Sequence, residues 1–282
     1  NHVDKAQPIF EDIIKNHKEH ETAEYSVNLL LDALNKWQKY DEMIKWVDIL
    51  IEDKKFLEGK DDLAERLGIL KNQSLRKAAE KCETNAKEKG DYALYVDCGQ
   101  MYIEIFNRNV EADDADILLY NAGVNFEQGK SIGAAIQMFE ALSQAFPKSV
   151  HTQKAIARLG KNYAAIAWYR ESAQKLEEYA KRFAGEKDAY DAMNDAVFYR
   201  KGIGDDEKAI ENTNYFIKTF GGKKPAEAAS AYFSLTSIYE KQGDKDKVVS
   251  HLRAYLKKYG EKGGADRAIV AWAKIGEILW DQ

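Results

Sequence analysis

The feature that most constrains the fold of this chain is a pattern of apolar and small residues that returns at a fixed interval. In residues 118–147, Gly123 lies three positions before Phe126, and thirty-seven residues later Gly160 and Tyr163 take their places. A shared offset at several positions indicates internal repeats. The same offset connects Phe146, Phe183 and Phe220.

Residues 232–260 show what one repeat contains. Tyr232, Leu235 and Tyr239 recur at i, i+3 and i+7, which places them on one face of a helix. Gly243 interrupts this pattern, and a second helical pattern follows it. The sequence therefore predicts a helical hairpin whose apolar face is buried only when neighbouring hairpins stack on it.

The composition also favours an all-helical protein. Hydrophobic residues make up 45% of the 282 residues, which is enough to build a core, and charged residues make up 32%. Only three prolines occur, so little interrupts helix over long spans.

The net charge of −5 argues against general nucleic-acid binding, which needs a basic surface. The charge is uneven, because residues 1–140 hold 18 Lys and Arg against 28 Asp and Glu, whereas residues 141–282 hold 24 against 19. This difference in charge fits either chance variation among solvated helix faces or an elongated body with an acidic and a basic end. We adopt the first interpretation.

The chain shows no targeting or membrane signal. No apolar run approaches the ~18 residues that a spanning helix needs, and the polar start does not resemble a signal peptide. Because the chain lacks an initiator Met and its apolar pattern still runs at Trp280, we expect an excised or processed segment.

The repeats resemble the tetratricopeptide family, in which two helices meet at a small residue. The residues that carry this resemblance are Leu159-Gly160-x-x-Tyr163, Ile275-Gly276, the Gly-Asp pairs at 90–91, 204–205 and 243–244, Ala135 and Ala209. The sequence departs from the family in two ways. Only Trp272 stands at the position early in the first helix where the family has Trp, and the repeats are spaced by 37 to 40 residues where the family has 34. The resemblance implies an all-α, right-handed superhelical solenoid of antiparallel hairpins with a concave groove.

We expect residues 1–282 to form a single solenoid of about six to seven hairpins. Residues 116–282 match the repeat pattern best, and residues 24–52 fit a hairpin that turns near Gln38. Residues 53–75 are expected to be irregular or to hold an extra or extended helix.

Catalysis receives no support from the motifs. There is no phosphate-binding glycine loop and no nucleophile elbow, and the histidines lack metal-ligand spacing. We therefore expect no catalytic residue, no metal and no cofactor. The five histidines are His2, His17, His20, His151 and His251.

The two cysteines lie at equal distances from a predicted turn. Cys82 precedes Gly90 by eight residues and Cys98 follows it by eight, so a hairpin would bring them nearly side by side. A disulfide needs Cα atoms about 4.4–6.8 Å apart, which is closer than typical helix axes. We expect two buried free thiols and leave the disulfide as the alternative.

In tetratricopeptide arrays the first helix of each hairpin lines the groove, so the resemblance also implies a set of ligand-binding positions. A basic triplet in this set, Lys154, Arg158 and Lys161, could hold an acidic segment of a partner. The full predicted set is Tyr120, Asn121, Glu127, Gln128, Lys154, Arg158, Lys161, Asp191, Asn194, Phe198 and Lys201.

A more specific prediction is a carboxylate clamp similar to that of chaperone-adaptor members of the family. These proteins hold a C-terminal carboxylate with Lys and Asn side chains from successive repeats. The matching positions here are Lys81, Asn85, Asn121, Lys154 and Arg158.

Three tryptophans near predicted turns could be either packing residues or binding hot spots. We expect core packing for Trp37, Trp46 and Trp168.

The sequence thus predicts a non-catalytic scaffold that binds a peptide or protein segment in its groove. Segments such as YLKKYG resemble those of bacterial cell-envelope tetratricopeptide proteins, which implies a periplasmic envelope machine, with a cytoplasmic location as the alternative. Two other functions stay open: a helical domain of an enzyme such as a cell-wall hydrolase or a transferase subunit, and a self-assembling structural protein whose acidic and basic halves attract each other. A homo-oligomer through the truncated ends of the chain is a further possible partner. We expect a protein partner, no nucleic acid and no membrane insertion.

Overall fold

The computed structural model describes residues 3–260 and 263–281, and within these ranges the chain forms helices without a strand. It divides into two compact units, Asn1–Met138 and Phe139–Gln282. The first unit contains α1 (Val3–Asn16), α2 (Thr22–Lys36), α3 (Tyr40–Glu52), α4 (Lys54–Leu57), α5 (Asp61–Lys89), α6 (Tyr92–Arg108) and α7 (Ala115–Gln128). The second contains α9 (Val150–Ala165), α10 (Tyr169–Arg182), α11 (Ala189–Gly202), α12 (Asp206–Phe220), α13 (Pro225–Ser234), α14 (Thr236–Lys241), α15 (Lys245–Tyr259) and α16 (Ala265–Trp280), and α8 (Ile132–Ala145) contributes to both.

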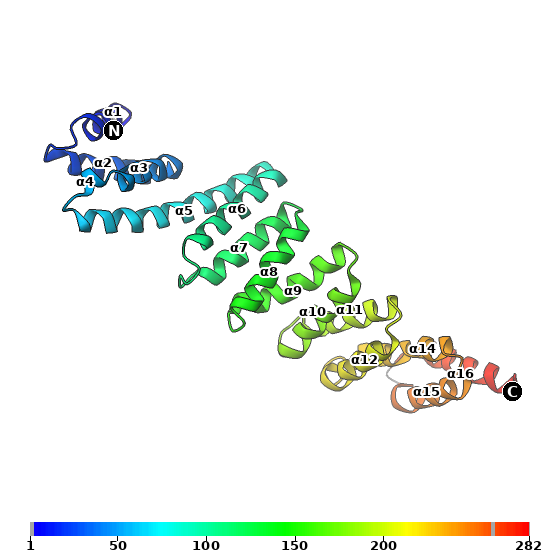
Figure 1. Cartoon of the computed structure of the whole chain (residues 1–282). Helices are drawn as coiled ribbons and strands as arrows, with labels where there is room; N and C mark the ends of the chain where they lie inside the picture. The colour runs from blue at the N-terminus through cyan, green and yellow to red at the C-terminus, as the bar shows by residue number, and fades with distance from the viewer. Residues whose placement is uncertain (1–2, 261–262, 282) are drawn as a thin grey trace. The chain divides into compact units, whose positions relative to one another are not determined.

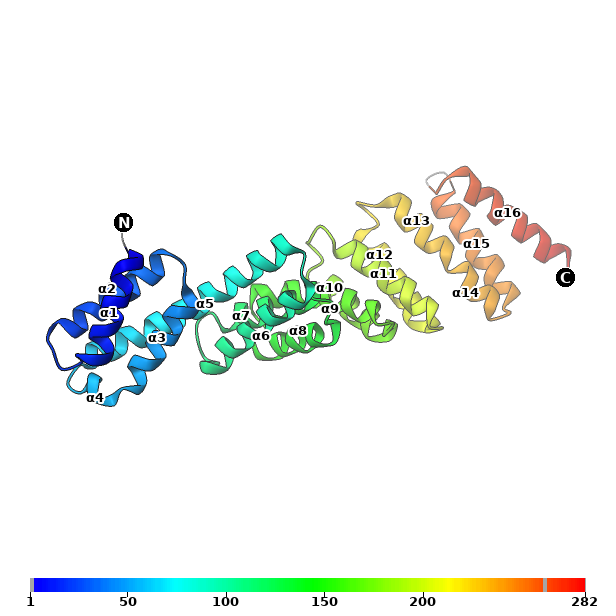
Figure 2. The ribbon, with the colours of Figure 1, turned by 90° about the horizontal axis from the view of Figure 1, so that it is seen from above.

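Most helices pack on helices that lie near them in the chain order. In the first unit α1 packs on α2, α3 on α5, α5 on α6 and α6 on α7 (Figures 1 and 2). In the second unit α9 to α12 follow one another as antiparallel helices, and α15 packs on α16 (Figure 1). The predicted fold class, all-α with antiparallel helical hairpins, is confirmed.

The Gly-Asp pairs make turns between helices, as the sequence predicts. Gly90 adopts the left-handed conformation with φ 62°, and the carboxylate of Asp91 accepts hydrogen bonds from the backbone N–H groups of Ala93 and Leu94. Glycine reaches this conformation without a steric cost, and aspartate caps the next helix. Gly204-Asp205 and Gly243-Asp244 repeat the arrangement.

Residues 53–75 fall in two helices. Asp53 caps the short α4 by accepting a hydrogen bond from the backbone N–H of Phe56, and α5 then runs without interruption for 29 residues to the turn at Gly90. The turn predicted near Gln38 lies between α2 and α3, and Gln38 there has a positive φ of 56°.

None of the helices in the described ranges is both long and apolar enough to span a membrane.

The two glycines that the repeat pattern assigns to helix crossings differ in their surroundings. A Cβ atom on Gly160 would lie 2.6 Å from Cδ2 of Leu176, which is buried, so α9 and α10 touch at this point. A Cβ atom on Gly276 would meet no other atom within 4 Å. Gly160 therefore permits a close helix contact, whereas Gly276 of α16 faces open space.

This difference gives a matched pair of substitutions. Gly160→Ala should lower the free energy of unfolding by about 1–3 kcal/mol, because the added methyl group overpacks the contact with Leu176. Gly276→Ala should leave it unchanged or raise it by up to about 1 kcal/mol, because alanine favours helix. Urea unfolding followed by circular dichroism measures both, and equal effects would contradict the proposed contact.

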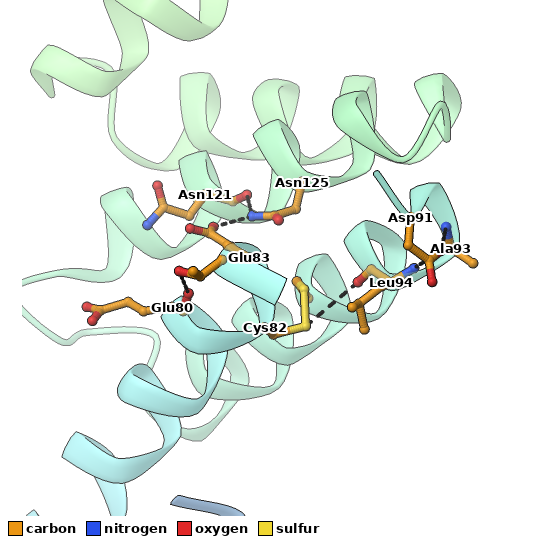
Figure 3. Close-up of a disulfide and its surroundings, with 10 residues drawn as sticks. Glu80, Cys82, Glu83, Asp91, Ala93, Leu94, Asn121 and Asn125 are labelled. Carbon is orange, nitrogen blue, oxygen red and sulfur yellow. Dashed lines mark hydrogen bonds between the residues drawn. A yellow bond between two sulfur atoms is a disulfide. The ribbon is translucent and has the colours of Figure 1, made fainter. Parts of the chain in front are cut away.

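Cys82 of α5 and Cys98 of α6 form a disulfide, so the expectation of two free thiols is wrong (Figure 3). Their Cα atoms are 5.6 Å apart, inside the range that a disulfide requires. The expectation was wrong because it compared the Cα–Cα distance that a disulfide needs with the distance between the axes of two packed helices. Cα atoms lie about 2.3 Å from the axis, so two facing residues come several ångströms closer than the axes do.

A buried histidine occupies the core of the second unit. His251 of α15 is 8% exposed, its ring stacks on that of Tyr232 with centroids 4.4 Å apart, and Nε2 lies 2.9 Å from the Tyr232 carbonyl oxygen, to which it donates. Burial lowers the pKa of His251 below its usual 6.5.

The lowered pKa predicts a pH-dependent stability. Above its unfolded-state pKa near 6.5 His251 is neutral in both states, whereas below it the unfolded chain binds a proton that the folded chain excludes. The free energy of unfolding should therefore fall as the pH drops through 6.5 towards the folded pKa. His251→Gln keeps a donor for the Tyr232 carbonyl and should flatten this part of the profile in urea unfolding. An unchanged pH profile would contradict the assignment.

Candidate functional site

The predicted groove residues of α7 lie on a half-buried face of the first unit. Tyr120, Asn121 and Glu127 are half-buried and Gln128 is exposed. A polar cluster next to them joins three helices. Asn125 of α7 donates from Nδ2 to the carboxylate of Glu83 on α5 and to the backbone carbonyl of Asn121, 2.8 Å away (Figure 3).

Tyr102 of α6 completes this cluster. It is 3% exposed, and burial together with the negative charge of Glu83 raises its pKa well above the usual value of 10. Its hydroxyl interacts with Glu83 and with Asn121. Asn121 is therefore part of a cluster that connects α5, α6 and α7.

The first half of the predicted carboxylate clamp lines a different hollow. Lys81 and Asn85 border a pocket of about 370 Å³ between the α2–α3 turn, α5 and α6. Nζ of Lys81 donates to the backbone carbonyl of Gln38 at 2.8 Å, so this ammonium group is engaged within the chain. Lys81 and Asn85 thus lie together, and Asn121 belongs to the Glu83 cluster instead. The clamp stays a prediction, because Lys154 and Arg158 lie in the second unit.

The basic triplet lies on α9 in the second unit. Lys154 and Lys161 are exposed and Arg158 is half-buried. Lys161 lies close enough to Asp195 of α11 to lower its pKa, although burial and the neighbouring Asp191 raise that pKa more strongly. Lys161 and Asp195 therefore bring both signs of charge to this part of the second unit.

Two of the predicted residues on α11 border a second hollow. Asp191 and Asn194 line a pocket of about 400 Å³ together with Tyr190 and with Glu227 and Ser230 of α13. Polar groups around an open hollow suit a hydrogen-bonded ligand.

Lys201 occupies a structural position at the end of the same helix. Its Nζ donates to the backbone carbonyl of Ser234 at 3.0 Å, and burial lowers its pKa. This side chain therefore connects α11 to α13.

Phe198 belongs to an exposed aromatic group that the sequence did not predict as a unit. Phe198 is 71% exposed, and its ring contacts that of Tyr199 with centroids 5.6 Å apart. Tyr199 stacks in turn on Tyr169 at the start of α10, with centroids 5.4 Å apart. We call Phe198, Tyr199 and Tyr169 the aromatic ladder. Phe198 and Tyr199 are consecutive in the sequence, but Tyr169 joins them only in the folded chain.

Trp168 lies next to Tyr169 and is 56% exposed, so the expected core packing is wrong for this residue. Its ring stacks over that of Tyr163 with centroids 6.0 Å apart, and its other surface faces solvent. Of the other two tryptophans, Trp46 is 7% exposed and packs in the core as expected, whereas Trp37 is 36% exposed, so the expectation is wrong for Trp37 too.

A buried ionic network supports α11 beneath the ladder. Arg200 is 4% exposed and donates to both carboxylate oxygens of Glu177 on α10, at 2.7 and 3.1 Å. It also donates to Asp205 at 2.8 Å, and Asn212 of α12 donates to Glu177 at 2.6 Å. Two-point contacts of this kind fix orientation as well as distance, so the network holds α10, α11 and α12 in one arrangement.

Substitution of Arg200 should therefore destabilise the folded chain. Arg200→Met should lower the free energy of unfolding by about 3–5 kcal/mol, because it leaves the carboxylate of Glu177 buried without its cation. Lys208→Met, which breaks a solvent-exposed ion pair with Glu211, should have a much smaller effect. Chemical denaturation of both variants measures the difference, and similar losses would show that the network does not stabilise the unit.

The described residues contain no group of three or more His, Cys, Asp or Glu side chains that could hold a metal ion. His17, His20, His151 and His251 lie within the described ranges, and His2 lies outside them.

No family model matches the chain, and no curated protein matches it. Among solved structures, the crystal structure of MamA protein is 19% identical, with a TM-score of 0.44, and the match covers 67% of this chain and 94% of that one. A putative kinesin light chain of Podosopora anserina with nearly identical TPR-like repeats is 12% identical, with a TM-score of 0.43, and the match covers 68% and 98%.

A third structure is a Signal Transduction ATPase with Numerous Domains protein with a tetratricopeptide repeat sensor from Pyrococcus horikoshii. It is 16% identical, with a TM-score of 0.44, and the match covers 96% of this chain and 43% of that one. These are similarities at low identity, and the fold described above rests on the helices of this chain.

Proposed function

We propose that this chain is a non-catalytic scaffold that binds a segment of a partner protein on the surface of the second unit that carries the aromatic ladder of α10 and α11. The observation that carries this proposal is the aromatic ladder. Large aromatic side chains normally bury their surface, yet Phe198 is 71% and Tyr169 is 42% exposed on neighbouring helices. Aromatic residues are enriched among the hot spots of protein interfaces.

The support beneath the ladder favours binding as well. Because Arg200 is fixed by Glu177 and Asp205, the helix that carries Phe198 and Tyr199 is held before a partner arrives. A rigid surface loses less conformational entropy on binding than a mobile one. The basic triplet on α9 and the pocket beside Asn194 would add polar contacts around the aromatic centre.

The alternative of an enzyme domain predicts a deep pocket with several carboxyl groups of raised pKa. Within the described ranges the raised carboxyl pKa is that of Asp195, an exposed residue, and the other shifted carboxyl groups have lowered values that follow from ion pairs or hydrogen bonds. This pattern supports the binding role.

The proposed location is an oxidising compartment such as the bacterial periplasm, within an envelope assembly. The disulfide supports this location, because disulfides form and persist in extracytoplasmic compartments and are rare in the cytosol.

The binding role is tested with a tagged chain incubated in native cell extract. Phe198→Ser should lose a discrete partner protein that the unchanged chain captures, with at least ~30-fold weaker binding for a hot spot. Lys154→Glu/Arg158→Glu tests the basic triplet in the same experiment.

Tyr25→Ser is the matched control, because Tyr25 of α2 is 64% exposed and lies in the first unit, outside the ladder. It should capture the partner normally, and circular dichroism should show equal helicity for all variants. Equal capture by the Phe198 variant would contradict the proposed surface.

One observation favours self-association as a second function. The outer face of α16 exposes Ile269 by 66%, Trp272 by 63% and Trp280 by 90%. Exposed apolar patches of this kind mark association sites. Light scattering should then show concentration-dependent oligomers that Trp272→Asp abolishes, and a monomer at every concentration would eliminate this function.

A further inference from the structure

The two cysteines of the disulfide differ in how far they are buried. Cys98 is 0% exposed, because α6 lies between α5 and α7 and the ring of Phe126 packs against the adjacent Gly99. Cys82 is half-buried, and it lines the 370 Å³ pocket bounded by the α2–α3 turn, α5 and α6. Cys82 is therefore the cysteine of the pair that borders solvent.

The pocket has a mixed lining that suits a small organic molecule. Ala78, Leu94 and Met101 supply apolar surface, whereas Lys39, Glu42 and Asn85 supply polar groups. Its volume is at the lower end of the range of small-molecule pockets.

We propose that Cys82 is the site at which this chain undergoes thiol–disulfide exchange with low-molecular-weight thiols and disulfides. Exchange proceeds by attack of a thiolate on one sulfur of a disulfide, so the sulfur that can be reached decides which mixed disulfide forms. Cys98 takes part only as the leaving or the closing thiolate. This assignment nowhere depends on the aromatic ladder, which lies in the other unit.

In the reducing direction, a small thiolate RS⁻ attacks Sγ of Cys82 and forms an RS–S bond there. The bond between Cys82 and Cys98 breaks, and Cys98 leaves as a thiolate that takes a proton from water. Burial disfavours a thiolate at Cys98, so Cys98 is a poor leaving group and the exchange is slow in this direction.

In the oxidising direction the same intermediate closes the disulfide. The Cys82 thiolate attacks a small disulfide RSSR, forms the mixed disulfide and releases one RS⁻. The Cys98 thiolate then attacks Sγ of Cys82 and releases the second RS⁻. The two cysteine thiols lose two electrons and two protons, and RSSR becomes two RSH. The last step in making this disulfide in the folded chain is thus the closure of a mixed disulfide on Cys82.

Two single-cysteine variants test the proposal. Cys98→Ala leaves the Cys82 thiol, and Cys82→Ala leaves the Cys98 thiol. Both are mixed with 5,5′-dithiobis(2-nitrobenzoic acid) under native conditions, and release of the coloured thiolate is followed. The Cys82 thiol should react at least ~100-fold faster, because Cys98 reacts only after local opening of the helices around it.

In denaturant the two variants should react at similar rates, which shows that folding causes the difference. Equal native rates for two variants of normal helicity, or a faster Cys98, would overturn the proposal.

A second measurement uses the intact oxidised chain and does not need either variant to fold. The chain is treated with 2-mercaptoethanesulfonate, quenched with acid and mapped by peptide mass spectrometry. The adduct should lie on Cys82, with a free thiol at Cys98. An adduct on Cys98, equal adducts on both, or no adduct under conditions that reduce the denatured chain would overturn the assignment.

Discussion

The structure depends on one constraint: a pair of short amphipathic helices cannot bury its own apolar face. Helices of 13 to 17 residues, such as α3 and α6, are barely stable in isolation. The free energy lost in nucleating a helix is larger than the free energy gained by adding a few turns. Packing on the preceding and following helices removes the apolar face of each from water. The recurring spacing of glycine and aromatic residues reflects this need for each hairpin to stack on its neighbours.

Once the stack supplies stability, the outward side chains are free for recognition. In the second unit, Arg200 points inward to Glu177 and stabilises the packing of α10 to α12, while Phe198 on the same helix remains exposed. The disulfide makes a comparable connection between α5 and α6 in the first unit. Connections in the interior and an aromatic surface outside are what the proposed binding role requires.

The sequence was sufficient for the helical class and for the turns. Apolar periodicity predicts the helices, and Gly90-Asp91 predicts its turn, because glycine permits the positive φ and aspartate caps the next helix. The equal spacing of Cys82 and Cys98 about Gly90 made the disulfide one of two alternatives, but the sequence does not show which faces of α5 and α6 meet, and this decides whether the two cysteines bond. The sequence predicted neither the aromatic ladder nor the exposure of Trp168, because both depend on contacts between residues of different helices. Gly160 and Gly276 share one pattern in sequence, yet only Gly160 lies at a close helix contact.

The most direct test of the stacking constraint is the helicity of an excised hairpin. A peptide of residues 150–183, which contains α9 and α10, is compared by circular dichroism with residues 150–259, which add α11 to α15. We predict a largely unfolded short peptide and a cooperatively folding long one, since about three repeats are needed for stability. A short peptide that is as helical as the intact chain and unfolds cooperatively would contradict the dependence of each hairpin on its neighbours.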